Sequence, residues 1–367
     1  MSIILGIEST AHTFGVAVVK DGKILSNCKR VFTTEKEGMI PIEVAKFHSS
    51  NKEEVYFEAL DSAKAKDFTP EGVHHQVGPE EGGARTSPPS RSDRRSRNFS
   101  REKFTKGIDA IAFSQGPGLA PCLLEGMKFA KELARKLKIP LVPVNHCIAH
   151  LEIGHLTGAR DPVMLYVSGA NTQIIAYASG KYRVFGETLD LGVGNFIDTF
   201  GRYVGLGFPA GLKIQKLAEG RKKYIELPYK VKGMDIALSG ILTNLRQKLE
   251  SKNYKLQNLA YSLQETVFAM LVETAERALA HTGKKELLLG GGVACNTRLQ
   301  EMCRIMCKER GAKFFCPPSE LLVDQGAMIA YTGELLFNNG DYVKPKDIGG
   351  VDILPRQRTD QVEIKYK

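Results

Sequence analysis

The sequence predicts an α/β protein made of two similar lobes. Near the N-terminus, an apolar strand at residues 3–7 leads into a short turn of small polar residues and then into a β-hairpin that ends near residue 28. The same order returns at residues 164–186, where an apolar strand, a small-residue turn and a hairpin follow one another. Helical stretches and further buried strands come after each hairpin, a pattern typical of sheets covered by helices. The duplication therefore predicts two lobes of one design.

In the first half, strands are predicted at residues 3–7, 15–19 and 23–28, and Asp21-Gly22 supplies the hairpin turn. Residues 42–66 are predicted as a helix. A buried strand at 108–113 is followed by the turn 114–118 and by a helix through residue 137. The apolar run 139–144 is a further strand.

In the second half, strands are predicted at 163–167, 173–177, 182–185 and 286–289, and helices at 195–204, 256–281 and 296–309. A strand, a turn able to face a phosphate and a hairpin is how the lobes of actin-like, sugar-kinase-like and Hsp70-like ATPases (the ASKHA fold) begin. We therefore expect this fold, with a ligand in the interlobe cleft. The N-terminal lobe is predicted at 1–145, a C-terminal lobe with the metal and nucleotide site at 146–330, and a helix and tail returning to the N-terminal lobe at 331–367.

Residues 74–106 differ in composition from the rest of the first lobe. They hold eight Lys/Arg and four acidic residues, and the part from 78 to 97 is rich in Gly, Pro, Ser and Arg with almost nothing apolar. Such a segment cannot bury a core, which predicts a disordered or exposed basic insertion. Either it is tolerated without a role, or it is a flexible arm that touches RNA.

The composition is that of an ordinary globular protein, with 43% hydrophobic and 25% charged residues in 367. No apolar run approaches the roughly 20 residues that cross a bilayer, and no secretory signal is evident, so no membrane association is expected. Seven cysteines without CxxC spacing favour reduced thiols and a cytoplasmic location, nuclear as well in a eukaryote. The net charge of +10 suggests a polyanionic partner such as nucleic acid.

His146 and His150 form the first candidate site. On a helix, residues four apart share a face, so two imidazoles could converge on one metal ion and leave positions open for other ligands. Two histidines at this spacing also occur by chance, and the pair alone leaves both interpretations open.

Three glycine-rich turns, at 168–172, 205–211 and 290–296, form the second candidate site. Glycine allows close approach of the backbone, and N–H groups at turns or helix starts favour phosphate. Asp198 and Asn296 lie near these turns in sequence and could bind ribose or base. Each turn taken singly is more often only a turn, and none is a Walker A loop.

Several ordered motifs resemble one family. They are GIESTAHT (6–13), SQGPGL (114–119), NHCIAH (145–150), LYVSGANTQ (165–173), GETLDLGVGNFID (186–198), GLGFPAG (205–211), GGVACNTRLQEM (291–302) and DQGAMIAYTG (324–333). These strings resemble the universal tRNA threonylcarbamoyltransferase (TsaD/Gcp) family. The string FGETLDLGVGN is similar to the archaeal and eukaryotic branch, which supplies the catalytic subunit of the KEOPS complex.

The resemblance implies a site for each ligand. The metal would be held by His146, His150, Tyr166 and Asp324, with iron (Fe²⁺) the expected ion, one per subunit, and zinc the alternative. The acyl and phosphate end of the substrate would lie on the turn Tyr166, Val167, Ser168, Gly169 and Ala170. The nucleoside would meet Asp198, Gly211, Gln215 and Asn296.

The implied reaction transfers a threonylcarbamoyl group from threonylcarbamoyl-AMP to N6 of adenosine 37, next to the anticodon, in tRNAs that decode ANN codons, with release of AMP. The implied partners are tRNA, ATP/AMP-type nucleotides and other KEOPS subunits, including a small atypical kinase and a dimerisation subunit. No Ser/His/Asp or Cys/His set is evident, and no general base is identifiable.

Several positions depart from the family pattern. Gln215 stands where a ribose-binding glutamate is expected, and the other departures are Ala170, Ala210, Ile40, Phe47 and Leu124. They raise the alternative of a divergent, low-activity paralogue acting as a nucleotide- and metal-binding scaffold. A metalloprotease is disfavoured because HxxxH lacks the glutamate of HExxH. A sugar kinase or plain ATPase would share the lobes but not the histidine pair.

Overall fold

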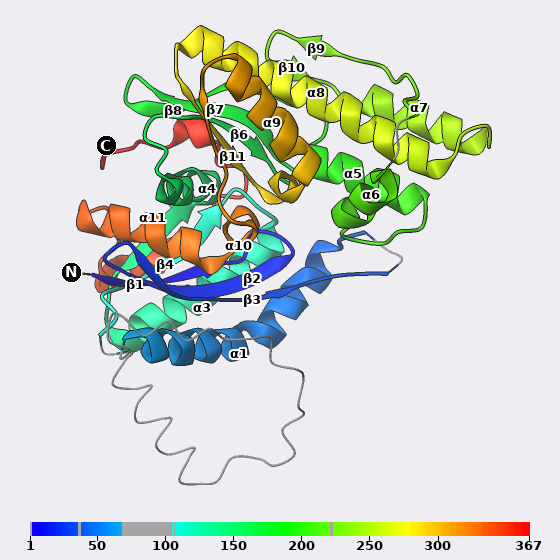
Figure 1. Cartoon of the computed structure of the whole chain (residues 1–367). Helices are drawn as coiled ribbons and strands as arrows, with labels where there is room; N and C mark the ends of the chain where they lie inside the picture. The colour runs from blue at the N-terminus through cyan, green and yellow to red at the C-terminus, as the bar shows by residue number, and fades with distance from the viewer. Residues whose placement is uncertain (1, 36–37, 68–104, 106, 221–222) are drawn as a thin grey trace.

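The computed structural model describes residues 2–35, 38–67, 105, 107–220 and 223–367, and the predicted insertion at 74–106 lies, apart from Thr105, outside them. Two five-stranded sheets are stacked, with helices on their outer faces and two helices, α4 (His146–Gly154) and α11 (Gly326–Asn338), between them (Figure 1). No helix among the described residues is long and apolar enough to cross a membrane. All seven cysteines are free thiols.

The first sheet has the strand order β3-β2-β1-β4-β5. Its strands are β1 (Ile3–Glu8), β2 (Thr13–Lys20), β3 (Lys23–Val31), β4 (Ala110–Gly116) and β5 (Leu141–Asn145). Strand β1 pairs antiparallel with β2 and parallel with β4, and five of its six residues are buried because both faces of the sheet are covered. Helices α1 (Pro41–Asp67) and α3 (Ala120–Leu137) pack on the outer face (Figure 1).

The second sheet has the strand order β12-β11-β6-β7-β8. Its strands are β6 (Val163–Val167), β7 (Thr172–Ala178), β8 (Lys181–Glu187), β11 (Glu286–Gly290) and β12 (Lys313–Phe315). Strand β6 pairs antiparallel with β7 and parallel with β11, as β1 does with β2 and β4. The two sheets thus share strand order and directions, which confirms the predicted duplication and the two-lobed ASKHA fold.

Five helices surround the core of the second sheet: α5 (Val193–Tyr203), α6 (Gly211–Ala218), α7 (Ser239–Glu250), α8 (Leu256–Thr282) and α9 (Thr297–Glu309). The short elements are η1 (His155–Thr157), β9 (Val231–Lys232), β10 (Asp235–Ile236), η2 (Gly292–Cys295), α10 (Ser319–Leu322), η3 (Pro345–Gly350) and η4 (Thr359–Gln361). The sequence patterns predicted α5, α8 and α9 to within two residues, but they did not identify α6 and α7.

Helix α11 follows the last strand of the second sheet in the chain, but it packs directly on β1, β2 and β4 of the first sheet. A Cβ atom on Gly6 would lie 2.3 Å from the backbone nitrogen of Ala330, so only glycine allows this close approach of helix and strand. The helix begins at Gly326, five residues before the predicted C-terminal unit at 331. The limits proposed for the lobes stay a prediction.

Candidate metal centre and nucleotide pocket

Helix α4 begins where β5 ends, and its first residue is His146. Asn145 caps the helix, because its side-chain oxygen accepts a hydrogen bond from the backbone N–H of Ile148 at 3.1 Å. Every residue of α4 is buried, as expected for a helix between two sheets. His146 and His150 therefore lie on one face of a short, fully enclosed helix.

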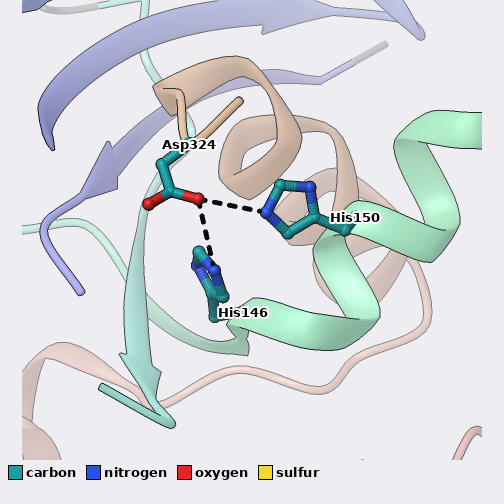
Figure 2. A group of neighbouring side chains, drawn as sticks. All are labelled: His146, His150 and Asp324. Carbon is teal, nitrogen blue, oxygen red and sulfur yellow. Dashed lines mark hydrogen bonds and ion pairs between the residues drawn. The ribbon is translucent and has the colours of Figure 1, made fainter. Parts of the chain in front are cut away.

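The two imidazoles meet the carboxylate of Asp324, which lies in the link between α10 and α11 (Figure 2). Oδ1 of Asp324 is 3.5 Å from Nε2 of His146 and 3.3 Å from Nε2 of His150. The potential ligand atoms of the three residues lie within 4.8 Å of one another, which is the separation expected around a single ion. Among the described residues, no other group of three His, Cys, Asp or Glu side chains has this geometry.

Tyr166 lies beside this group at the end of β6. Its ring centroid is 5.1 Å from that of His150, and the side chain is fully buried. Its hydroxyl has no hydrogen-bond partner among the described residues, a situation that costs about 1–3 kcal/mol when a polar group is buried. A metal ion bound by the three other side chains would give this oxygen a partner. The donor set of two imidazoles, one carboxylate and one phenol fits a borderline divalent ion.

Glu8 is a member of this candidate site that the sequence analysis missed. Its carboxylate is fully buried at the end of β1, and Oε2 lies 3.1 Å from Nδ1 of His146. Oε1 accepts hydrogen bonds from the backbone N–H and the hydroxyl of Thr10, at 2.7 and 2.5 Å. A carboxylate on the outer nitrogen of a metal-binding histidine fixes the ring and its tautomer. The available signal was an acid ending an otherwise apolar strand.

The buried carboxylates and imidazoles of this group shift the pKa values of one another. Burial by itself lowers the pKa of His146, but the carboxylates of Glu8 and Asp324 outweigh it and raise that pKa to about 9. Burial lowers the pKa of His150 below its ordinary value, against the opposite effect of the Asp324 carboxylate. Burial raises the pKa of Asp324, yet the neighbouring imidazoles dominate and hold it below its usual range. A metal ion would have to displace the proton from His146, as metal ions do at histidine ligands.

The first and third glycine-rich turns lie together at the start of α5, and the second turn contacts the same helix nearer its end. A Cβ on Gly291 would be 2.4 Å from the carbonyl oxygen of Val167, so the third turn lies against the first. The backbone N–H groups of Gly194 and Asn195 donate to the carbonyls of Ser168 and Gly169 at 3.0 and 2.8 Å. Tyr166 lies in β6, the strand that leads directly into the first turn. The turns are therefore neighbours of the candidate metal ligands His146, His150 and Asp324, which we call the metal group.

The second turn joins the others through α5 and α6. Asp198 of α5 accepts a hydrogen bond from the backbone N–H of Ala210 at 2.8 Å, and Gly211 begins α6. The amide nitrogen of Gln215 donates to the hydroxyl of Thr297, the first residue of α9, at 3.1 Å. The amide oxygen of Gln215 is buried and has no partner among the described residues.

Asn296 has a structural task that its predicted role does not include. Its side-chain oxygen caps α9 by accepting from the N–H groups of Arg298 and Leu299, and its amide nitrogen donates to Gln264 at 2.6 Å. The side chain therefore has partners on both sides within the protein.

The departures from the family pattern occupy different surroundings. Ala170 is exposed, whereas Ala210 is fully buried and fills the space next to Gly201, whose own Cβ would lie 2.2 Å from that of Ala210. Ile40 is 46% exposed. Leu124 lines a groove between α1 and α3.

Solved structures with the same arrangement include HypF from T. kodakarensis, with a TM-score of 0.58 and 16% identity over 95% of this chain. The chain spans about half of that protein, 49% of its length. A full-length HypF in the phosphate- and nucleotide-bound form gives a TM-score of 0.56 at 12% identity over 91% of this chain and 46% of the other. At these identities the likeness shows the fold alone.

Sequence relatives are much closer. The tRNA N6-adenosine threonylcarbamoyltransferase of Thermococcus sibiricus is 47% identical over 99% of this chain and 100% of its own length, and that of Thermococcus kodakarensis is 47% identical over 99% of both. A probable bifunctional tRNA threonylcarbamoyladenosine biosynthesis protein of Methanosarcina mazei is 44% identical over 100% of this chain and 60% of its own length.

The likeness extends beyond the motifs, because these alignments also take in the C-terminal residues that the motifs leave out. A sequence model of the family TsaD, tRNA N6-adenosine threonylcarbamoyltransferase, matches residues 100–331. The chain belongs to the tRNA N6-adenosine threonylcarbamoyltransferase family.

Proposed function

We propose that the protein transfers the threonylcarbamoyl group of threonylcarbamoyl-AMP to N6 of adenosine 37 in tRNAs that decode ANN codons. In this reaction a bond forms between N6 and the carbamoyl carbon, the bond from that carbon to the phosphate oxygen breaks, N6 loses a proton, and AMP leaves. The observation that carries the proposal is the group His146, His150 and Asp324, with the unpartnered hydroxyl of Tyr166, directly beside the glycine-rich turns.

The side chains of His146, His150, Tyr166 and Asp324 would hold one divalent ion, for which we propose iron (Fe²⁺), with zinc as the alternative. When bound, such an ion polarises a carbonyl or orients a carboxylate and hydroxyl, which suits an acyl donor facing a weak nucleophile. Glu8 would orient His146 for this task, since it touches the outer nitrogen of that ring.

The turn at 166–170 would bind the acyl and phosphate end, because it begins at the proposed metal ligand Tyr166 and small residues let a phosphate approach the backbone. Asp198, Gly211 and Gln215 would bind the nucleoside. The unpartnered amide oxygen of Gln215 supports this assignment, since a ribose hydroxyl can donate to it. Asn296 would contribute only through lone pairs that its hydrogen bonds within the protein leave available. We assign no general base.

tRNA is the acceptor in this proposal, which agrees with the net charge of +10. We further propose a KEOPS-type complex that includes a small atypical kinase and a dimerisation subunit, in the cytoplasm. The Methanosarcina mazei relative is named as a probable bifunctional protein, and this chain spans only 60% of its length. The rest of that length leaves room for a second functional unit in the same chain, which supports a partner protein for this one.

The test is to incubate wild-type protein with threonylcarbamoyl-AMP, unmodified tRNA and the partner subunits, and to measure the modified nucleoside. His146→Ala should lose metal and at least about a hundredfold in rate, as expected for removal of a metal ligand. His281→Ala, a change at an exposed histidine of α8, is the matched control and should behave as wild type. A folded, metal-loaded wild type that forms no modified nucleoside would favour the scaffold alternative, and phosphate release that persists in His146→Ala would favour an ATPase.

A further inference from the structure

Residues 352–367, which we call the C-terminal segment, contain only one short helical turn, η4, yet they touch both lobes. On the first lobe, the backbone N–H of Leu354 donates to the carbonyl of Gln115 at 2.8 Å, and that of Gly118 donates to Pro355 at 3.2 Å. A Cβ on Gly116 would lie 2.0 Å from the carbonyl oxygen of Leu354. The segment is therefore held tightly against the turn that follows β4.

The segment then reaches the start of α4. The side-chain oxygen of Gln357 accepts a hydrogen bond from the amide nitrogen of Asn145 at 3.0 Å. The oxygen of that same Asn145 amide caps α4. Gln357 thus fixes the orientation of the cap, and the next residue in the chain is the proposed metal ligand His146.

The segment also holds the other end of α4. Glu152, in the last turn of α4, is 2% exposed, and its Oε1 accepts a hydrogen bond from the hydroxyl of Tyr366 at 3.0 Å. Tyr182 of β8 donates to the same oxygen at 2.7 Å. A buried carboxylate keeps its position only while such donors are present.

Between these two contacts, the segment covers α4 with apolar side chains. Ile364 is 6% exposed, and with Val362 and Tyr366 it belongs to a cluster that also contains Cys147, Ile148 and Leu151 of α4. A helix of nine residues has little stability of its own, so its position depends on what packs against it.

We propose that the C-terminal segment is a clamp that positions the metal ligands, with Gln357 and Tyr366 as positioning residues at the two ends of α4. This inference rests on the proposed function only for the role of the metal. The effect of the C-terminal segment on the position of α4 can be measured without metal or substrate.

The test compares four variants of the full chain with wild type. Gln357→Met removes the acceptor for Asn145 at similar length, Gln357→Glu keeps it, and Tyr366→Phe removes one of the donors to Glu152. Glu363→Gln changes an exposed residue of the same segment and is the control. In metal-free protein, Gln357→Met and Tyr366→Phe should each speed amide hydrogen exchange in α4 about fivefold to tenfold. Gln357→Glu and the control should match wild type.

Binding of Co²⁺, followed by its visible spectrum, gives the second measurement. The two disruptive variants should raise its Kd about tenfold, the size expected when a group that orients a ligand is lost. The clamp is contradicted if exchange in α4 is unchanged in both variants, or if exchange rises equally along the whole chain. If the wild-type protein modifies tRNA but amide exchange in α4 is the same in both variants as in wild type, the clamp is contradicted and the proposed function stands. Faster exchange in α4 supports the clamp even in a protein that modifies no tRNA.

Discussion

At the scale of single residues, the site combines groups that would be costly to bury together without a ligand. Asp324 and Glu8 bring carboxylates to two buried imidazoles, and Tyr166 adds a hydroxyl without a partner. The carboxylates have partners in the imidazoles, but the phenol has none among the described residues. The phenol is therefore the side chain whose behaviour depends most on a bound ion.

Tyr166→Phe is expected to act in opposite directions on two measurable quantities. Loss of an unsatisfied hydroxyl should raise the free energy of unfolding of metal-free protein by about 1 kcal/mol, since nothing is left unpaired. Metal affinity should fall about tenfold, because one ligand is gone. Denaturant unfolding and metal titration measure the two effects.

Tyr224→Phe is the control for this experiment, because the Tyr224 hydroxyl lies 2.8 Å from that of Thr266, away from the metal group. It should gain no stability and bind metal as wild type does. A Tyr166→Phe protein that is less stable without metal would show that the hydroxyl has a partner after all.

Gln215→Glu should strengthen binding of the nucleotide. In the proposed site Gln215 would offer one neutral oxygen to a ribose hydroxyl, and a carboxylate accepts hydrogen bonds about twice as strongly. We expect KM for threonylcarbamoyl-AMP to fall about threefold to tenfold with little change in kcat. Gln247→Glu, on the exposed face of α7, should leave both constants unaltered. If KM is unchanged in Gln215→Glu, Gln215 does not bind the ribose.

The histidine pair could be found from the sequence because both residues belong to one short helix. Glu8 could not be assigned in the same way, since it reaches His146 only after β1 and β5 join one sheet with β4 between them. Tyr166 and Asp324 were named through the family resemblance, because a strand aromatic and an acid before a helix have ordinary structural explanations. The cap role of Asn296 was recognisable from its place before an amphipathic helix.

At the scale of elements, the glycines of the proposed nucleotide site differ from ordinary turn glycines. Gly291 and Gly283 both have positive φ, +89° and +69°, but only Gly291 lies against other backbone atoms. Gly283→Ala should therefore cost about 1 kcal/mol through backbone strain alone. Gly291→Ala should cost at least twice as much, because the turn must move away from Val167. It should also weaken binding of threonylcarbamoyl-AMP.

Equilibrium unfolding and nucleotide titration of the two glycine variants test this difference. Equal losses of stability, with nucleotide binding intact in both, would show that the third turn has room to adapt and does not define the pocket.

Elements with strong local patterns were predictable and others were not. Strand β6 has the predicted bounds, 163–167, because it is a continuous apolar run between two polar stretches. Helix α11 was expected only as part of the unit 331–367, without bounds of its own, since it is apolar over much of its surface and shows little amphipathic pattern. Its position depends on Gly6 and Gly326, which only the assembled lobes bring together.

At the scale of the whole molecule, the metal group lies where the two lobes meet. The histidines come from α4, which is enclosed between the sheets, Asp324 from the link to α11, Tyr166 from the second sheet and Glu8 from the first (Figure 1). A movement of the second sheet relative to the first would shift Tyr166, which lies on β6, relative to Glu8, which lies on β1. The arrangement of the lobes is therefore part of the geometry of the site, as it is in other folds that bind ligands in clefts.

The central claim is that this interlobe group holds a metal ion needed for transfer to tRNA. The most direct measurement removes metal from wild-type protein with a chelator and then restores Fe²⁺ stepwise, while the modified nucleoside is measured with threonylcarbamoyl-AMP, tRNA and the partner subunits present. We expect no more than a few per cent of the initial rate without metal, and recovery that is complete at about one ion per chain. Full transfer by verified metal-free protein would contradict the account.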